Sequence, residues 1–265
     1  MRKINKIKLF SNHTERSDSI LDELVGLIKL YDFELVDEGF DLAIAIGGDG
    51  AFLRMVKDTN FDSSVYYIGI NTGTLGFLQE IRPNNLRSFI EALNNDDFKV
   101  DNIGVLETKV STDDSISRYY ALNEVVVREL ELNALLMDIH VDHVKLETYM
   151  GDGVLISTSV GSSAYNTSFR GALVYNTLHT LQIMPIAPIN TKAYRNLLNP
   201  IVLPEKKHIE LYPLKKTILL TFDGENKRYN NVKKIECFVK NKKLKFLRMK
   251  EYNFINIVNE KFLTD

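Results

Sequence analysis

The residues Gly47-Gly48-Asp49-Gly50 combine the types that phosphate chemistry needs. They follow the apolar run 42–46 and precede a helical pattern, so their N–H groups would meet an anion at a helix N-terminus. Asp49 would repel a phosphate unless it accepts a proton or binds a metal, as aspartates of kinases do. Taken alone, these four residues are equally compatible with a tight turn in which Asp49 caps the helix.

A second glycine-containing segment, Asn71-Thr-Gly-Thr-Leu-Gly-Phe77, follows the strand-like run 65–70. Open α/β sheets bind their ligands at the carboxyl ends of strands. Two successive strand ends that carry glycine loops therefore favour a ligand site. The alternative is a plain turn between a strand and a helix.

The third candidate is longer and rich in small and hydroxyl side chains. Gly151-Asp152-Gly153 precedes a strand-like run, and the segment 157–166 then leads into a helix predicted over 162–174. Small side chains would admit a planar base, and Tyr165 could pack on a ring. Asp152 could accept hydrogen bonds from ribose or amide groups. A serine-rich helix cap in a structural protein would look similar.

Two polar dipeptides have structural interpretations when taken alone. Asn123-Glu124 interrupts the apolar strand run 119–127 and is expected on its exposed face, because burial without partners would cost free energy. Asp223-Gly224 is a typical hairpin turn.

Three other features are interpreted as structural. His140 and His143 flank a predicted hairpin turn and are expected on the surface. Cys237 lies in a strand run and is expected to pack inertly. The basic run 240–245 is expected to form a hairpin with a solvated face.

The pattern of apolar residues predicts two domains. Strand-like and helix-like segments alternate over residues 1–100, which predicts an α/β domain with a mostly parallel sheet, joined by the tail from about 248 to 265. Residues 101–247 alternate with period two and predict a mainly β domain. Its strand-like runs include 119–127, 137–146, 154–157, 217–222 and 234–239.

The composition predicts a soluble, cytoplasmic protein. Of the 265 residues, 45% are hydrophobic and 26% charged, and 33 basic against 35 acidic residues give a net charge of −2. This balance gives no sign of nucleic-acid or membrane-surface binding. A single cysteine fits a reducing compartment. No apolar run approaches the roughly 20 residues that span a bilayer, and no secretory signal is recognisable.

Taken in order, these motifs resemble the bacterial NAD kinase family from about residue 40 to 200. The resemblance implies an α/β N-terminal domain, a sandwich-like β C-terminal domain and an active site in the cleft between them. It implies transfer of the γ-phosphate of ATP, or of another donor, to the 2′-hydroxyl of the adenosine ribose of NAD, with Mg²⁺ or another divalent cation. It also implies a homotetramer with shared sites. No direct protein ligand for the cation is predicted.

The resemblance also assigns residue roles. Asp49 would act on the 2′-hydroxyl, and Gly47, Gly48 and Gly50 would bind phosphate. Residues matching NAD-binding positions are Asp49, Gly50, Phe77, Asn123, Glu124, Asp152, Ser163, Ala164, Tyr165, Asn166, Ser168, Ala187 and Ile189. Among these, Asp152, Ala187 and Ile189 would approach the nicotinamide half across a subunit boundary. Further candidates in or beside the motifs are Met150, Thr158, Val160, Asp223 and Gly224.

Three positions depart from the family pattern. Met150 stands where a basic residue is common, Ser159 where a proline is usual, and Ala51 where a threonine is frequent. The alternatives to an NAD kinase are a related lipid or sugar-phosphate kinase and a non-catalytic sensor of NAD or NADP.

Overall fold

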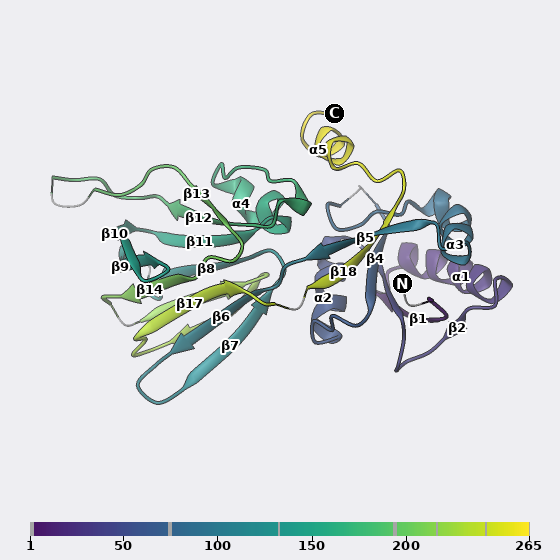
Figure 1. The fold of residues 1–265 in the computed structure, drawn as a ribbon, viewed down its shortest axis with the longest axis horizontal. Coiled ribbons are helices and arrows are strands. Elements are labelled where there is room, and N and C mark those ends of the chain that lie inside the picture. The colour runs from purple at the N-terminus through teal and green to yellow at the C-terminus, as the bar shows by residue number, and fades with distance from the viewer. Residues whose placement is uncertain are drawn as a thin grey trace. The chain divides into compact units, whose positions relative to one another are not determined.

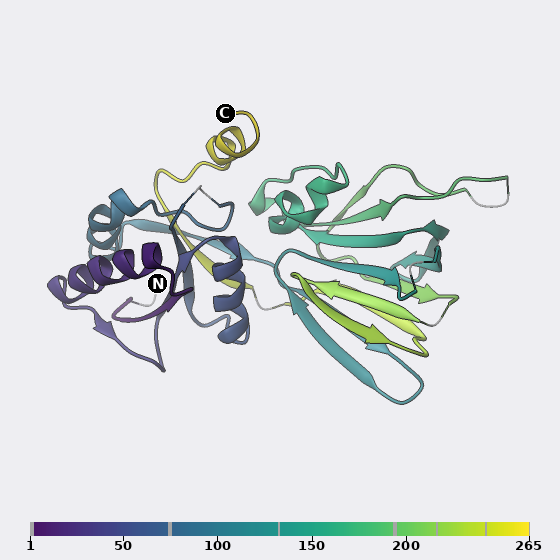
Figure 2. The same ribbon diagram turned by 180° about the vertical axis from the view of Figure 1, so that it is seen from behind.

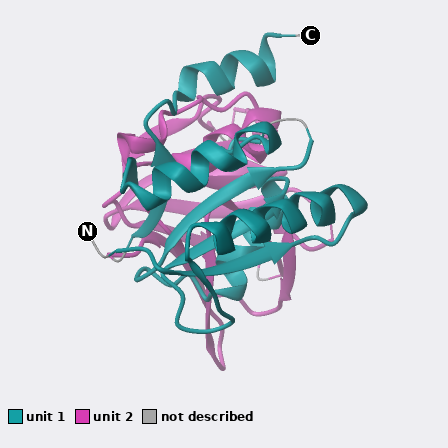
Figure 3. Ribbon diagram, turned by 90° about the vertical axis from the view of Figure 1, so that its right-hand side faces the viewer, with its two compact units in different colours: residues 1–103, 243–265 teal, residues 104–242 magenta. Residues whose placement is uncertain are grey.

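The computed structural model describes residues 3–73, 76–131, 133–192, 195–215, 217–241 and 243–264. The chain divides into two compact units, one of residues 1–103 with 243–265 and the other of residues 104–242 (Figure 3). Within the described ranges, no helix is long and apolar enough to cross a membrane.

The first unit is built on a six-stranded sheet of order β2-β1-β3-β4-β18-β5 (Figure 1). All neighbouring strands are parallel except β5, which runs antiparallel to β18, so the predicted mostly parallel sheet is confirmed. The strands are β1 (Lys6–Ser11), β2 (Glu34–Leu35), β3 (Leu42–Gly47), β4 (Tyr66–Asn71), β5 (Phe98–Ile103) and β18 (Leu244–Met249).

Helices cover both faces of this sheet (Figures 1 and 2). Ile44 of β3 and Ile68 of β4 belong to one buried cluster with apolar residues of α1 and α3. On the other face, Phe52 of α2 packs edge-on against Phe246 of β18. Burial on both faces explains why β3 and β4 are apolar up to Ile46 and Ile70. The helices are α1 (Glu15–Leu30), α2 (Asp49–Asp58), η1 (Pro83–Asn85), α3 (Leu86–Asn94) and α5 (Phe254–Phe262).

The second unit is a sandwich of two antiparallel sheets, of order β10-β9-β14-β17-β6-β7 and β13-β12-β11-β8-β15-β16. Alternate residues of both sheets, such as Val127 of β8 and Met137 of β9, form one buried core. The strands of the first sheet are β6 (Leu106–Ser111), β7 (Ile116–Ala121), β9 (Leu135–Val141), β10 (Val144–Gly151), β14 (Ile209–Pro213) and β17 (Lys234–Val239). Those of the second are β8 (Glu124–Glu129), β11 (Gly153–Thr158), β12 (Thr180–Ile186), β13 (Ile201–Pro204), β15 (Ile218–Phe222) and β16 (Glu225–Tyr229).

Two predicted hairpin turns are confirmed. Asp142 and His143 join β9 to β10, and Asp223 and Gly224 join β15 to β16. Both residues of each pair have positive φ, as a two-residue turn that follows the twist of the strands requires.

The prediction of a single strand over residues 119–127 is wrong. The chain instead ends β7 at Ala121 and begins β8 at Glu124, in the other sheet of the sandwich. The break occurs because the backbone N–H groups of Leu122 and Asn123 donate to the carboxylate of Asp223 instead of to a neighbouring strand. Asn123 and Glu124, expected on an exposed face, are therefore buried at this crossing.

The prediction of one helix over residues 162–174 is also wrong. Only η2 (Val160–Ser163) and α4 (Tyr165–Ser168) form, and a third short helix, η3 (Asn176–Leu178), follows a loop. The Ser162 hydroxyl exchanges hydrogen bonds with the backbone of Val174, and the Asn166 amide donates to the carbonyls of Ser162 and Ala172. These side chains compete with helical hydrogen bonding.

The hairpin predicted over 240–245 does not form either. The chain leaves the sandwich after β17 and enters the first unit as β18, which begins at Leu244. Leu244 and Phe246 are buried there, and Lys245 between them is not. Pairing with β4 and β5, which are distant in sequence, determines that this segment forms a strand of the first unit.

Candidate active site

The first glycine loop joins β3 to α2. Gly47 ends the strand, Gly48 caps the helix and Asp49 is its first residue. A β-carbon at Gly47 would lie 2.7 Å from that of Ala51, so this position requires glycine. Gly48 and Gly50 are exposed, which leaves their backbone accessible to a ligand at the helix N-terminus.

Asp49 connects the two glycine loops. Its Oδ2 accepts a hydrogen bond from the backbone N–H of Phe77 and its Oδ1 from that of Leu78, both at 3.0 Å. Gly76 approaches the carboxylate so closely that a β-carbon there would lie 1.9 Å from Asp49 Oδ1. Each carboxylate oxygen keeps a second lone pair for another donor. Thr74 and Leu75 of the second motif lie outside the described residues.

The sequence interpretation missed Gln79, which supports the first loop. Its side chain is 1% exposed, and its Nε2 donates to the carbonyl of Gly48 at 2.7 Å. Gly69 of β4 makes room for it, because a β-carbon there would lie 1.9 Å from Gln79 Oε1. The only signal in the sequence is a polar residue just beyond the glycine motif.

Two arginines near the glycine loops were also missed. The Arg54 Nη1 lies 3.8 Å from the position of a β-carbon on Gly50, and the Arg16 Nη1 lies 3.9 Å from that on Gly73. Arg54 follows Gly50 by one helical turn, a spacing that could have indicated it. Both guanidinium groups place positive charge near the glycine loops.

In the second unit, Asp223 organises the crossing at Asn123 and Glu124. Its carboxylate accepts backbone N–H groups from Leu122 at 2.6 Å, Asn123 at 2.9 Å and Glu124 at 3.3 Å. The Thr158 hydroxyl donates to the Leu122 carbonyl at 2.6 Å. Asp223 was interpreted as a turn residue, and the structure shows that its side chain also holds this crossing.

Glu124 is a buried acid with spare hydrogen-bonding capacity. Its side chain accepts the backbone N–H of Tyr165, whereas its Oε2 is buried without a partner among the described residues. Burial, and then the charge of Asp223, raise the pKa of Glu124 to about 8. A buried polar atom without a partner is costly, so a ligand hydroxyl or amino group that bonds to it would gain free energy.

Tyr165 forms an exposed aromatic platform beside Glu124. Its side chain is 41% exposed, and its ring meets that of Phe169 edge-on at 4.9 Å between centroids. Its hydroxyl accepts a hydrogen bond from Arg128 Nη2 at 3.0 Å. Phe169 packs on the outer face of the β8, β11 and β12 sheet, so the platform has a rigid base.

The other predicted residues of this segment differ in exposure. Ser163 and Ala164 are half-buried and Ser168 is exposed, whereas Thr158 and Val160 are buried. Asn166 is fully buried, and its amide nitrogen is used within the loop. Its predicted contact with a ligand stays a prediction.

Met150, Asp152, Ala187 and Ile189 lie at the opposite end of β11 from Thr158. At about 3.3 Å per residue, this six-residue strand separates the two groups by roughly 17 Å. The predicted site residues of the second unit therefore form two groups. Asn196, which the sequence interpretation missed, holds the second group together, since its amide bonds to the backbone of Met150 and Ile189.

His208, Glu210 and Glu236 are the described residues whose ligand atoms could surround a metal ion. The Lys234 Nζ already lies 2.6 Å from Glu210 and 3.3 Å from Glu236. Although burial opposes it, Lys234 lowers the pKa of Glu210 to about 2. The Lys234 ammonium group therefore neutralises these carboxylates in place of a metal ion. His143 contacts Glu210 and is largely exposed, as predicted.

Joined glycine loops around an acid, together with a buried glutamate and an aromatic platform on a β-sandwich, define a two-domain phosphotransferase that acts on a nucleotide. The ATP-NAD kinase N-terminal domain family matches residues 7–98, and the ATP-NAD kinase C-terminal domain family matches residues 122–249. The chain belongs to the NAD kinase family, as the motifs predicted.

Relatives and solved structures agree with this assignment. The chain is 39% identical to an NAD kinase of Finegoldia magna over 91% of this chain and 89% of that protein. It is 31% identical to one of Staphylococcus saprophyticus over 97% of each. Yeast NADH kinase, solved with NADH, has a TM-score of 0.88 at 19% identity, over 100% of this chain and 90% of that one. An Archaeoglobus fulgidus NAD kinase, solved with ATP, has a TM-score of 0.76 at 22% identity, over 96% and 98%. These two structures confirm the predicted fold.

Proposed function

We propose that this protein transfers the γ-phosphate of ATP, or of another phosphate donor, to the 2′-hydroxyl of the adenosine ribose of NAD and so produces NADP. The observation that carries the proposal is the match to both domains of the NAD kinase family, which spans both candidate groups of residues that bear chemistry.

Asp49 is the proposed general base. The N–H groups of Phe77 and Leu78 hold its carboxylate in one orientation and leave lone pairs for a substrate hydroxyl. Asp49 accepts the proton of the 2′-hydroxyl as the phosphoryl group transfers in line. Most of the rate comes from positioning and electrostatics, because phosphoryl transfer needs little covalent chemistry from the protein.

The donor phosphates are proposed to bind at the first glycine loop. Gly47, Gly48 and Gly50 offer backbone N–H groups, and Arg54 and Arg16 add positive charge. A Mg²⁺ ion or another divalent cation is proposed to enter with ATP, because such ions are commonly bound together with substrate phosphates. Such an ion would neutralise charge that develops on the phosphoryl oxygens, and no direct protein ligand for it is predicted.

NAD is proposed to bind at the Glu124 crossing. Glu124 offers to a ribose hydroxyl or a base amino group its Oε2, which no described residue contacts by a hydrogen bond, and Tyr165 stacks on a ring. Other residues assigned to NAD binding are Gly50, Phe77, Asn123, Ser163, Ala164, Asn166 and Ser168, with Thr158, Val160, Asp223 and Gly224 in supporting positions.

A homotetramer in the cytoplasm is the proposed form of the enzyme. The distance along β11 between Tyr165's loop and the group of Met150, Asp152, Ala187 and Ile189 supports this assembly. The second group would complete the nicotinamide end of the site in another copy of the chain. Sedimentation at several protein concentrations would test the assembly.

The function is tested by incubating the purified protein with ATP, Mg²⁺ and NAD and measuring NADP with an NADP-specific dehydrogenase. NADH, a diacylglycerol lipid and a sugar phosphate serve as competing acceptors. NADP formation that falls about a hundredfold or more in Asp49→Asn and stays intact in Asp58→Asn supports the proposal. Phosphorylation of the lipid or sugar alone, or NAD binding without turnover, would contradict the proposed function.

A further inference from the structure

Phe77 links the proposed base to the C-terminal helix. Its backbone N–H donates to Asp49 Oδ2 at 3.0 Å. Its ring lies 5.4 Å from that of Phe262 and 6.3 Å from that of Phe254, centroid to centroid, and both belong to α5. One residue therefore contacts the carboxylate with its backbone and the helix with its side chain.

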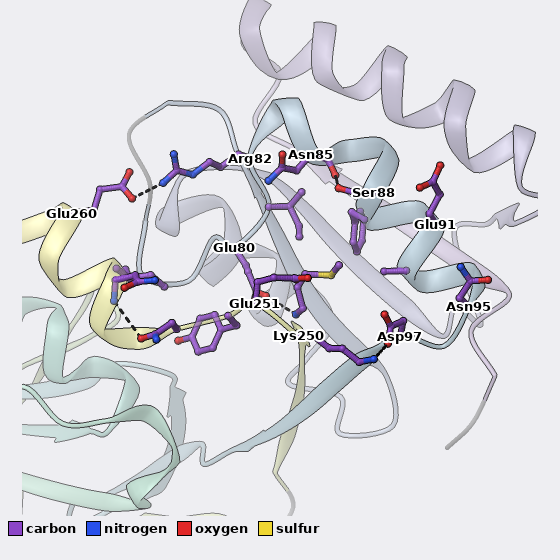
Figure 4. A pocket seen from close by; sticks show the side chains of 18 residues that line it. Glu80, Arg82, Asn85, Ser88, Glu91, Asn95, Asp97, Lys250, Glu251 and Glu260 are labelled. Carbon is purple, nitrogen blue, oxygen red and sulfur yellow. Dashed lines mark hydrogen bonds and ion pairs between the residues drawn. The ribbon is translucent and has the colours of Figure 1, made fainter.

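The loop that carries Phe77 is attached to the C-terminal segment at two further points. Arg82 forms an ion pair with Glu260 of α5, and the two side chains point toward one another in Figure 4. Glu80 accepts hydrogen bonds from the backbone N–H of Met249 and from Arg248, at the end of β18. The end of the chain thus holds the loop from Phe77 to Arg82 along its length.

The helix itself is lightly packed. Only Phe254 and Ile257 of its nine residues are buried. A groove of about 520 Å³ lies between α3 and α5, lined by residues such as Asn85, Ser88, Asn256 and Glu260 (Figure 4). A helix with so few buried residues opens locally at low cost in free energy. Its contacts with Phe77 and Arg82 are its links to the loop, which Glu80 also ties to the end of β18.

We propose that α5 is a clamp that positions Asp49. By packing on Phe77, it keeps the N–H groups of Phe77 and Leu78 directed at the carboxylate and so fixes the orientation of the base. Phe254 and Phe262 are positioning residues, and they act through Phe77. The catalytic consequence of the clamp rests on the proposed function, whereas its structural part does not.

The test compares Phe262→Ala with Ile255→Ala in the full chain. Ile255 is an exposed apolar residue of the same helix, so its removal controls for general effects on α5. Backbone hydrogen exchange at Phe77 and Leu78 reports the structural part by NMR, and NADP formation reports the catalytic part.

Phe262→Ala is expected to speed exchange of both amides and to lower kcat about tenfold, with KM for ATP within about twofold, because misplacing a catalytic group costs rate more than binding. Phe262→Leu should restore most of the rate, and Ile255→Ala should change neither readout. Unchanged exchange at Phe77 and Leu78 in Phe262→Ala would overturn the clamp. A wild-type protein that forms no NADP would contradict the proposed function, and the exchange measurement would still decide the clamp.

A milder variant tests the clamp in case Phe262→Ala unfolds α5. Glu260→Gln removes the ion pair with Arg82 and keeps the rings, so it should produce the same changes at smaller size, whereas Glu251→Gln, an exposed acid, should not. Equal exchange at Phe77 and Leu78 in the two glutamine variants would also count against the clamp.

Discussion

The backbone N–H of Glu124 donates to the carboxylate of Asp223 at 3.3 Å, so two acids ninety-nine residues apart in the chain meet at the crossing between the sheets of the sandwich. Asp223 is satisfied by three backbone N–H groups, whereas one oxygen of Glu124 has no partner within the part of the chain that the structure describes. Burial, and then the charge of Asp223, raise the pKa of Glu124 to about 8. The contrast marks Asp223 as the support and Glu124 as the residue available to a ligand.

This relationship predicts how stability depends on pH. The pKa of Glu124 is about 8 in the folded chain and about 4.5 in the unfolded chain, so between these values the folded chain binds more protons. The free energy of unfolding should therefore fall as pH rises from 4.5 to 8, by up to about 1.4 kcal/mol per pH unit from this residue. Urea unfolding of Glu124→Gln should show a flatter dependence over that range.

Glu131→Gln is the control, since Glu131 is exposed. It should keep the wild-type dependence on pH. If Glu124→Gln and Glu131→Gln gave the same slope as the wild type, the raised pKa of Glu124 would be refuted.

Replacing the proposed base should affect turnover more than stability. In Asp49→Asn, one amide nitrogen would face a backbone N–H in place of an oxygen, which should cost about 1–3 kcal/mol of unfolding free energy. Loss of the base should lower kcat about a hundredfold or more. Steady-state kinetics and urea unfolding measure the two effects. Turnover within threefold of the wild type would show that Asp49 is not the base.

Gly76 should be intolerant of a side chain. In Gly76→Ala, the new β-carbon would meet Asp49 Oδ1 at 1.9 Å and displace the carboxylate, so kcat should fall. Gly26→Ala on the exposed face of α1 meets nothing within 4 Å and should stabilise the protein by about 0.5–1 kcal/mol. Full activity in Gly76→Ala would mean that the loop can shift without moving Asp49.

The aromatic platform predicts a change in affinity for NAD. Stacking on an aromatic side chain contributes about 1–3 kcal/mol per base, so Tyr165→Ala should weaken NAD binding about tenfold or more. Tyr165→Phe keeps the ring and loses only the hydrogen bond from Arg128, so its affinity should change much less. Calorimetric titration with NAD measures the affinity of each variant. Equal affinities in the two variants would show that the Tyr165 ring does not stack on NAD.

The elements near Asp49 could be predicted from the sequence because they are local. An apolar run, a glycine loop and an amphipathic pattern follow one another over residues 42–58, and they form β3, the loop and α2. Adjacent parallel strands then place the second glycine loop beside the first. The hairpins at Asp142-His143 and Asp223-Gly224 were predictable for the same reason, since a two-residue turn depends on its own residues.

The tertiary structure alone decided the rest. The break after Ala121, the burial of Glu124 and the entry of β18 into the first unit depend on partners about a hundred residues or more away, and no local pattern records them. The contact of Phe77 with α5 is of the same kind. The sequence by itself determined the family, the order of the local elements and the acid in its glycine loop. The folded chain determined which polar groups are satisfied and which are left for a ligand, because burial and hydrogen bonding depend on residues brought together only by folding.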